Sequence, residues 1–279
     1  MKPLTLAYSP CPNDTFIFCG LIHGRFSLPG LTLAPPVLDD VETLNEWALA
    51  GRFDITKLSF HALAHVLDEY CLLSAGSALG RGCGPLLVAG KQIESRSLAH
   101  CRVAIPGRLT TAALLFSLFC PECSELVPMR FDRIMAAVQA GEVDAGVIIH
   151  ESRFTYDQFG LICLQDLGHW WEQTSGLPIP LGCIAARRSL GEERITAIDQ
   201  AIRASVAWAH AHPADCLPYI RAHAQEIDEQ VMQSHIGLYV NDFSSDLGSE
   251  GLAAVQAFFD RGRQAGILPE SDQGLLVAS

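Results

Sequence analysis

Residues 146–156 read GVIIHESRFTY, an apolar run that ends at a histidine, His150, and continues into polar and aromatic residues. This pattern is typical of an α/β strand that delivers a side chain to a cleft, because ligands in such sheets bind beyond the carboxyl ends of the strands. Histidine titrates near neutral pH and is the commonest proton-transfer residue. His150 is therefore a candidate catalytic residue, and the alternative is a histidine that merely packs.

Short apolar strands alternate with amphipathic helices along the rest of the chain. Expected strands include residues 4–8, 31–38, 54–58, 102–105, 143–149 and 181–186, and residues 192–266 are almost wholly helical. This order predicts an α/β fold with a largely parallel sheet and helices on both faces. The rhythm restarts near residue 101 and the helical tail follows a strand near 181. We therefore expect a large lobe, 1–99 with 181–279, and a small inserted lobe, 100–180.

Charge and hydropathy narrow the class of partner. The net charge is −12, which argues against nucleic acid or an anionic membrane as partner. No apolar run approaches the ~20 residues that span a bilayer, and the first residues resemble a strand rather than a signal peptide. We expect a cytoplasmic protein that binds a small molecule. A local site can still bind an anion against the global charge, and a homodimer is left open.

Hydroxyl groups stand where two helices are expected to begin after strands, at Ser59 and at Thr110-Thr111. Free backbone N–H groups and the helix dipole favour a carboxylate or phosphate at such a point. The alternative is that these residues are ordinary helix caps. Lys57 lies near a strand end, where it either meets an anion or points into solvent from an edge.

Three other groups carry weaker signals. Cys11 lies in a proline-stiffened loop and would need a histidine partner in space to act as a nucleophile. Cys120 and Cys123 have C-x-x-C spacing, but no second pair completes a zinc site. His61 and His65 have the i, i+4 spacing of metal ligands without a third ligand nearby. Most of the other cysteines lie in apolar surroundings, where a thiol acts as a small hydrophobe.

Several motifs in order resemble those of the 1,4-dihydroxy-6-naphthoate synthase family. They are SPCPNDTF at 9–16, DVETLN at 40–45, KLS at 57–59, PGRLTT at 106–111, IHESRFTY at 149–156 and GLPIPLG at 176–182. The resemblance runs from residue 4 to about residue 260. Several long motifs in the right order are more specific than any single signature.

This resemblance implies a two-lobed fold like that of type II periplasmic solute-binding proteins and a role in the futalosine route to menaquinone. The implied reaction converts cyclic dehypoxanthinyl futalosine to 1,4-dihydroxy-6-naphthoate and dihydroxyacetone, without a metal or organic cofactor. The family's catalytic histidine corresponds to His150, as the base. Its substrate-binding residues correspond to Lys57, Leu58, Ser59, Thr110 and Thr111.

Two other functions compete with this one. The first is a non-catalytic binding protein for a small carboxylate on the same fold, which a missing secretion signal and a histidine at the cleft disfavour. The second is a chorismate dehydratase, a related enzyme of the same pathway, which should lack the pattern IHESR at 149–153.

Overall fold

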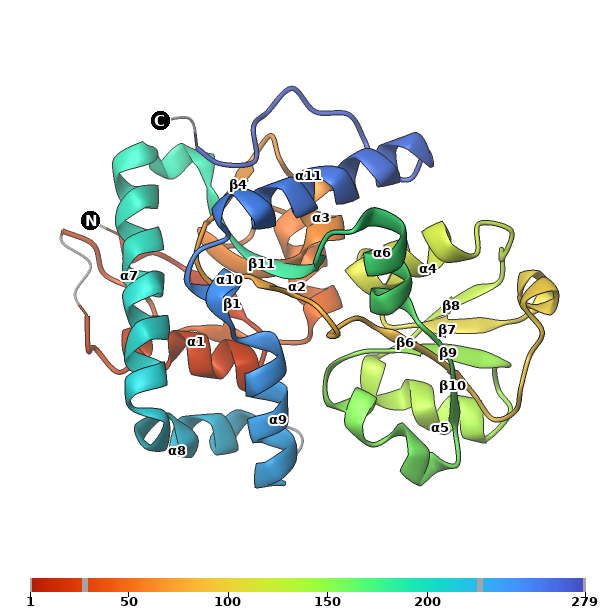
Figure 1. Cartoon of the computed structure of the whole chain (residues 1–279). Helices are drawn as coiled ribbons and strands as arrows, with labels where there is room; N and C mark the ends of the chain where they lie inside the picture. The colour runs from red at the N-terminus through yellow and green to blue at the C-terminus, as the bar shows by residue number, and fades with distance from the viewer. Residues whose placement is uncertain (1, 27–29, 225–227, 278–279) are drawn as a thin grey trace.

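The computed structural model describes residues 2–26, 30–224 and 228–277, and its strands form two sheets that lie side by side (Figure 1). The first sheet has the order β2-β1-β3-β11-β4, with β5 also paired to β11. The second has the order β10-β6-β9-β7-β8. The first contains β1 (Leu6–Tyr8), β2 (Val37–Leu38), β3 (Ile55–Ser59), β4 (Tyr70–Leu72), β5 (Ala78–Gly80) and β11 (Ile179–Arg187). The second contains β6 (Leu86–Ala89), β7 (Val103–Ile105), β8 (Leu126–Pro128), β9 (Ala145–Ile148) and β10 (Ile162–Asp166).

Both sheets are mixed, so the expectation of a largely parallel sheet is wrong. β1 runs parallel to β2 and β3, but β11 runs antiparallel to β3, β4 and β5. In the second sheet β7 is parallel to β8 and β9, whereas β6 is antiparallel to β9 and β10. The antiparallel members are β6 and β11, the strands that follow the passages of the chain between the two sheets. The alternation of strands and helices along the chain does not predict such pairings, because they join residues that are far apart in the sequence.

We call the first sheet with its helices the first lobe, and the second sheet with its helices the second lobe. The chain passes to the second lobe between β5 and β6 and returns between α6 (Leu167–Ser175) and β11 (Figure 1). By sheet membership the first passage precedes Leu86 and the return precedes Ile179. The division of the chain into lobes at 1–99, 100–180 and 181–279 stays a prediction.

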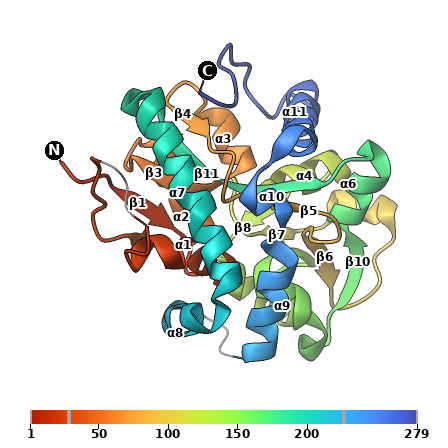
Figure 2. The ribbon, with the colours of Figure 1, turned by 60° about the vertical axis from the view of Figure 1, so that its left-hand side comes forward.

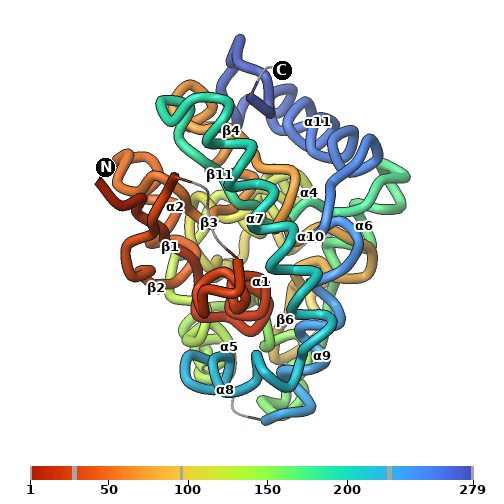
Figure 3. Tube along the Cα trace, turned by 90° about the vertical axis from the view of Figure 1, so that its left-hand side faces the viewer, coloured from red at the N-terminus to blue at the C-terminus, as the bar shows by residue number. Residues whose placement is uncertain are grey.

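Helices cover both faces of the first sheet. On one face α1 (Pro12–Ile22) packs against α7 (Glu192–Ala211), α8 (Pro213–His223) and α9 (Glu229–Tyr239), and Figures 2 and 3 show α7 crossing the lobe next to α1. The other first-lobe helices are α2 (Val41–Leu49), α3 (Phe60–His65), α10 (Asp242–Ser245) and α11 (Gly248–Gln264). The second lobe has α4 (Thr111–Phe119), α5 (Ile134–Gln139) and α6. Within the described ranges, no helix is long and apolar enough to cross a membrane.

Short 3-10 helices complete the chain, and one of them follows β9 directly. This helix, η3 (His150–Phe154), begins at the candidate catalytic histidine. The others are η1 (Ser95–His100), η2 (Phe131–Arg133), η4 (Tyr156–Phe159) and η5 (Arg188–Leu190).

The lobes share one hydrophobic core. Leu58 and Cys183 from the first sheet belong to the same buried cluster as Val103 and Val147 from the second. A second cluster lies under α1 and α7, and a third lies between α5 and the second sheet. Burial of apolar surface contributes roughly 25 cal/mol per Å², so the common cluster holds the two sheets together behind the space in which a ligand can bind.

Two helix starts show how well local signals work. Asp40 caps α2, because its carboxylate accepts the backbone N–H groups of Glu42 and Thr43 at 3.0 and 3.4 Å. In contrast, α1 starts at Pro12, within the segment expected to be a proline-stiffened loop, with Cys11 at the N-cap and no side-chain cap. Proline suits the first helical turn because its missing N–H has no partner there. Pro12 therefore begins this helix instead of belonging to a loop before it.

Candidate active site

Two adjoining cavities lie where the lobes meet. The main cavity has a volume of about 640 Å³, which includes space open to solvent. The second cavity, about 610 Å³ by the same measure, adjoins it at Val41 and His150, which line both. The main cavity is lined by Ser9, Asn13, Asp14, Val41, Lys57, Ser59, Ala78, Cys83, Pro85, Thr110, Thr111, Ala112, Ile149, His150, Leu181, Gly182, His235 and Tyr239. The second is lined by Pro10, Cys11, Leu38, Asp39, Asp40, Val41, Arg130, Phe131, His150 and Glu151.

The main cavity brings together five of the six residues singled out from the sequence. His150, Lys57, Ser59, Thr110 and Thr111 all line it, although they come from three separate segments and both lobes. The sixth, Leu58, is fully buried in the common core and lines neither cavity. Its side chain is therefore unavailable to a ligand, and any contact of Leu58 with substrate has to use its backbone.

His150 holds an unusual backbone conformation. It begins η3 directly after β9 and Ile149, with φ 57°, the one positive φ of a non-glycine residue among the described residues. The left-handed region costs an L-residue on the order of 1–3 kcal/mol and persists where the surrounding structure enforces it, often at functional sites. This turn aims the imidazole into the space between the lobes instead of along the strand.

The surroundings of His150 favour a neutral imidazole. Burial lowers the pKa of His150 below its usual value, and the negative charges of Glu151 and Asp14 oppose that shift. A neutral ring is the form that accepts a proton, so this environment is suited to a general base. Phe131 packs edge-on against the ring at 5.0 Å between centroids and limits its movement.

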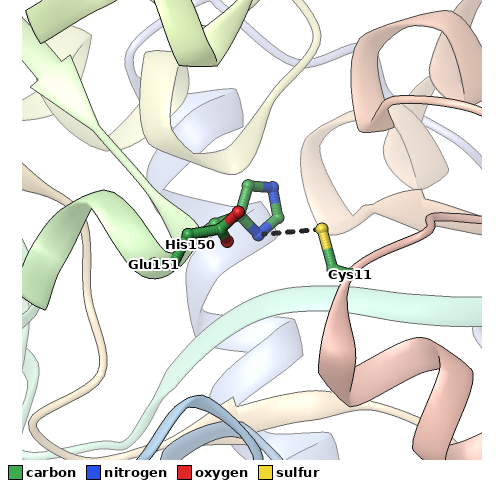
Figure 4. Close-up of side chains that lie close together, drawn as sticks. All are labelled: Cys11, His150 and Glu151. Atoms are coloured by element: carbon green, nitrogen blue, oxygen red, sulfur yellow. Dashed lines mark hydrogen bonds between the residues drawn. The ribbon is translucent and has the colours of Figure 1, made fainter. Parts of the chain in front are cut away.

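Cys11 is the hydrogen-bond partner of His150. Its Sγ lies 3.7 Å from Nδ1 of the imidazole, as Figure 4 shows, and Cys11 is itself buried. Burial and the charge of Glu151 raise the pKa of the Cys11 thiol well above its usual value. The thiol therefore stays protonated at neutral pH, which argues against a thiolate nucleophile. When Nδ1–H points to this sulfur, Nε2 is left as the proton-accepting atom.

Lys57 is the cation of the main cavity, and it is neither at a sheet edge nor in solvent. It lies in β3, between β1 and β11, and its Nζ forms an ion pair with Oδ1 of Asp14 at 2.5 Å. Both side chains are almost fully buried, at 6% and 1% exposure. Opposite β3, Gly182 leaves room for the lysine, since a Cβ there would lie 3.0 Å from its Cε. The sequence signal for an edge lysine was misleading because the pairing of β11 with β3 is long-range.

Asp14 connects Lys57 to two further polar residues. Its Oδ2 accepts the Ser9 hydroxyl at 2.7 Å, and its Oδ1 accepts the Asn13 amide at 2.8 Å. Asn13 Oδ1 in turn lies 3.0 Å from Nε2 of His235 on α9. Asp14 occupies the first turn of α1, where the helix dipole also stabilises a negative charge. A continuous buried network therefore links the lysine of β3 to a histidine 178 residues later in the chain.

Thr110 and Thr111 form the start of α4 at the cavity wall. Thr110 caps the helix, since its Oγ1 accepts the Ala113 N–H at 3.2 Å. Thr111 donates its hydroxyl to the Leu181 carbonyl at 2.6 Å. The cap interpretation is thus correct for Thr110, but it does not exclude a ligand. The first N–H groups of a helix lack intrahelical partners and face the cavity side with a positive dipole end.

Side chains from the first lobe hold this helix start in place. His61 Nδ1 donates to the Thr110 carbonyl at 3.1 Å, and Glu42 accepts the Leu109 N–H at 3.0 Å. Glu42 also accepts the Asn45 amide at 3.2 Å, and the same amide contacts the Ser59 hydroxyl at 3.2 Å. The carboxylate-binding candidates of the two lobes, Ser59 and α4, are therefore tied together by one set of hydrogen bonds.

One group in the described part of the chain has the spacing of metal ligands. Ligand atoms of Cys11, His150 and Glu151 lie within 4.8 Å of one another (Figure 4). A thiolate, an imidazole and a carboxylate suit a borderline metal such as Zn²⁺, once the thiol is deprotonated. A metal there would occupy His150, so it would compete with proton transfer. Neither the His61–His65 pair nor the Cys120–Cys123 pair belongs to such a group.

Sequence reasoning missed His235 and Tyr239, which line the main cavity from α9. His235 is fully buried, and it lies on the same helix face as the buried Met232 and Tyr239. A histidine at an apolar position of an amphipathic helix was the available signal. Asp14 and Asn13, both buried, line the main cavity as well.

The comparisons with known proteins agree with this geometry. A family model described as "Menaquinone biosynthesis" matches residues 4–264. The chain is 52% identical over 99% of its length to a 1,4-dihydroxy-6-naphthoate synthase of Thermus thermophilus, of which it covers 100%. It is 46% identical to a protein of the same name from Streptomyces coelicolor, over 95% of each chain.

Solved structures show the fold. A protein from Archaeoglobus fulgidus, 37% identical, superposes with a TM-score of 0.89 over 95% of this chain and 98% of that one. A Candida albicans protein described as having the generic periplasmic binding protein fold is only 14% identical but superposes with a TM-score of 0.68, over 98% and 92% of the two chains. The two-lobed periplasmic-binding-protein-like fold expected from the resemblance is therefore confirmed.

Proposed function

The chain belongs to the 1,4-dihydroxy-6-naphthoate synthase family of menaquinone biosynthesis, and we propose that it converts cyclic dehypoxanthinyl futalosine to 1,4-dihydroxy-6-naphthoate and dihydroxyacetone with His150 as the base. The observation that carries the proposal is the position of His150. A neutral imidazole lines the cavity opposite a lysine and the start of α4.

The substrate has a benzoate-type carboxylate, and the proposed place for it is the wall formed by Ser59 and the start of α4. The donors available at that wall are the first backbone N–H groups of α4 and the Ser59 hydroxyl, because the Thr110 and Thr111 hydroxyls already donate to the carbonyls of Gly107 and Leu181. Lys57 adds a positive charge from β3. Such donors bind a carboxylate without many basic residues, which fits a chain of net charge −12. Lys57, Ser59, Thr110 and Thr111 would contact the substrate through these groups, and Leu58 through its backbone.

The role of His150 follows from the reaction. A base removes a proton, a carbon–carbon bond breaks, and the ring system that remains becomes aromatic. Because aromatisation supplies driving force, the protein mainly has to orient the substrate and accept the proton. The neutral ring of His150, held by Phe131 and Cys11, supports this role.

One assay with purified protein tests the proposal against its two competitors. Cyclic dehypoxanthinyl futalosine and chorismate are offered separately, and aromatic product is followed by ultraviolet absorbance and identified by mass spectrometry. Naphthoate formed from the first compound is the expected result. Product from chorismate would indicate a dehydratase, and binding of either compound without product would indicate a binding protein.

We also place the enzyme in a reducing compartment, the cytoplasm. All ten cysteines, each within the described ranges, are free thiols, whereas exported proteins often oxidise theirs to disulfides. A homodimer stays a prediction, which light scattering on the purified protein tests.

A further inference from the structure

Two buried polar atoms beside His150 lack hydrogen-bond partners in the described part of the chain. They are Nδ1 of His235 and Oε2 of Glu151, and they lie 3.9 Å apart. That distance is too long for a direct hydrogen bond. Their side chains are only 1% and 12% exposed. A buried polar atom without a hydrogen bond lowers the stability of the fold by about 1–3 kcal/mol. We therefore expect these two atoms to bind a group that does not belong to the chain.

The polar network fixes which kind of partner fits. The carboxylate of Asp14 can only accept hydrogen bonds, so the Asn13 atom that faces it is the amide nitrogen, which donates. The amide oxygen of Asn13, Oδ1, therefore points toward His235. Nε2 of His235 must then carry the hydrogen, at 3.0 Å from that oxygen. Nδ1 of His235 is buried and has no acceptor within hydrogen-bond distance among the described residues, which disfavours a second, charged proton on the ring. Nδ1 is therefore a bare lone pair, and it faces a second acceptor on Glu151.

The pair lies where the two cavities meet. His235 lines the main cavity, Glu151 lines the second cavity, and His150 lines both. The rings of His150 and His235 are nearly parallel, with centroids 6.1 Å apart. A group bound by the pair would therefore be next to the imidazole that is proposed to accept the proton.

We propose that His235 Nδ1 and Glu151 Oε2 form a binding subsite for two neighbouring hydroxyl groups of the ligand, that is, for a vicinal diol. Each hydroxyl donates its proton to one acceptor. The 3.9 Å between the acceptors is near the spacing that two hydroxyls on adjacent carbons can bridge, and a pair of acceptors rejects a carboxylate or carbonyl at that point. This subsite deepens the proposed function, on which it rests, because the ribose-derived ring of cyclic dehypoxanthinyl futalosine carries neighbouring hydroxyls.

The test uses His235→Gln, which keeps a donor close to Nε2 for Asn13 and removes the acceptor at Nδ1. Turnover is blocked with His150→Asn, so that binding is measured at equilibrium by calorimetry. The ligands are cyclic dehypoxanthinyl futalosine and the product 1,4-dihydroxy-6-naphthoate, whose two phenolic hydroxyls are not on adjacent carbons. The matched control is His212→Gln in the same background, since His212 is exposed at the end of α7.

We expect His235→Gln to weaken substrate binding by about 10-fold, the effect of one lost acceptor, and to change product binding less than threefold. Glu151→Gln should act in the same direction, and His212→Gln should change neither affinity. Equal losses for both ligands would mean that His235 only supports the cavity wall, and unchanged substrate affinity would mean that the pair does not bind it. Either result overturns the subsite. Turnover by the unmodified chain is measured separately, so failure of the proposed function is recognised independently.

Discussion

The carboxylate of Glu42 on α2 accepts the backbone N–H of Leu109, which precedes α4 in the other lobe. Its two oxygens lie 3.0 and 3.2 Å from that nitrogen. The neighbouring Gly107 makes room for this contact, because a Cβ there would be 2.3 Å from Cδ of Glu42, and its φ is 143°. Glu42 is outside the lining of the main cavity, yet it fixes the position of the helix start that is proposed to bind the substrate carboxylate.

Glu42→Ala should raise KM about 10-fold and change kcat less. A hydrogen bond to a charged group contributes about 1.5–3 kcal/mol, and its loss frees the start of α4 without touching the base. Glu42→Gln keeps an acceptor at the same place and should stay within threefold of the unmodified enzyme. Steady-state kinetics measure KM and kcat for both variants and for the unmodified enzyme. An unchanged KM in Glu42→Ala would show that α4 is held by its other contacts alone.

His150→Ala should lower kcat by about two orders of magnitude or more, while substrate still binds. Alanine disfavours the positive φ at this position, so His150→Asn is the second variant, because asparagine tolerates the left-handed region. Both variants should lose turnover to a similar extent. Near-normal turnover in either one, measured by formation of the naphthoate, would remove His150 from the role of base.

The variant Cys11→Ala distinguishes between two roles of Cys11, a covalent nucleophile and a hydrogen-bond partner of His150. The raised pKa of the buried thiol predicts a supporting role, in which the sulfur helps to orient His150. We expect a loss of kcat of less than about 10-fold, consistent with one weak hydrogen bond. If Cys11 were a covalent nucleophile, the variant would lose nearly all activity. Mass spectrometry of the unmodified enzyme during turnover would then show an adduct on Cys11.

Local chemistry predicted what lies close in sequence. The start of α4 at Thr111 and the strand that ends before His150 both depend on neighbouring residues, and both were found within one or two residues. The motif resemblance then identified five residues that line one cavity. These signals are strong because capping and strand burial are decided within a few residues.

The features that could not be predicted from the sequence depend on contacts between segments that are far apart in the chain. Lys57 is buried because β11 pairs with β3 and Asp14 approaches from α1, two partners far from it in the chain. His235 enters the cavity because α9 packs beside α1 and η3. No periodic signal near Lys57 shows its partners, and the helical pattern around His235 indicates burial without showing which segment the histidine meets. The same holds for β6, whose neighbours in the second sheet are β9 and β10.

Lys57→Met should destabilise the protein by about 3 kcal/mol, because it leaves the Asp14 carboxylate buried without its ion-pair partner. The double variant Lys57→Met/Asp14→Asn removes the stranded charge and should recover much of that stability. Substrate affinity should remain low in both, since the cavity has lost its cation. Urea unfolding and substrate binding are measured side by side. Recovery of binding together with stability would mean that Lys57 acts only through the fold.

His61 gives a prediction about stability and pH. Burial lowers the pKa of His61 to about 4, and its Nδ1–H donates to the Thr110 carbonyl. In the unfolded chain this histidine titrates near 6.5. Between these values the unfolded state binds the additional proton, so the free energy of unfolding falls as the pH is lowered. The contribution of His61 is complete above pH 6.5 and is lost progressively toward pH 4.

Replacing His61 with asparagine should therefore flatten the pH dependence. Asparagine retains an N–H donor for the Thr110 carbonyl but does not titrate. Over the window from pH 6.5 to 4, urea unfolding should show a decrease in the free energy of unfolding that is smaller by roughly 3 kcal/mol in His61→Asn than in the unmodified chain. His212→Asn, at an exposed histidine, is the control and should leave the profile unchanged. Parallel profiles for the unmodified chain and His61→Asn would mean that His61 is as easily protonated when folded as when unfolded, which would contradict its burial against the start of α4.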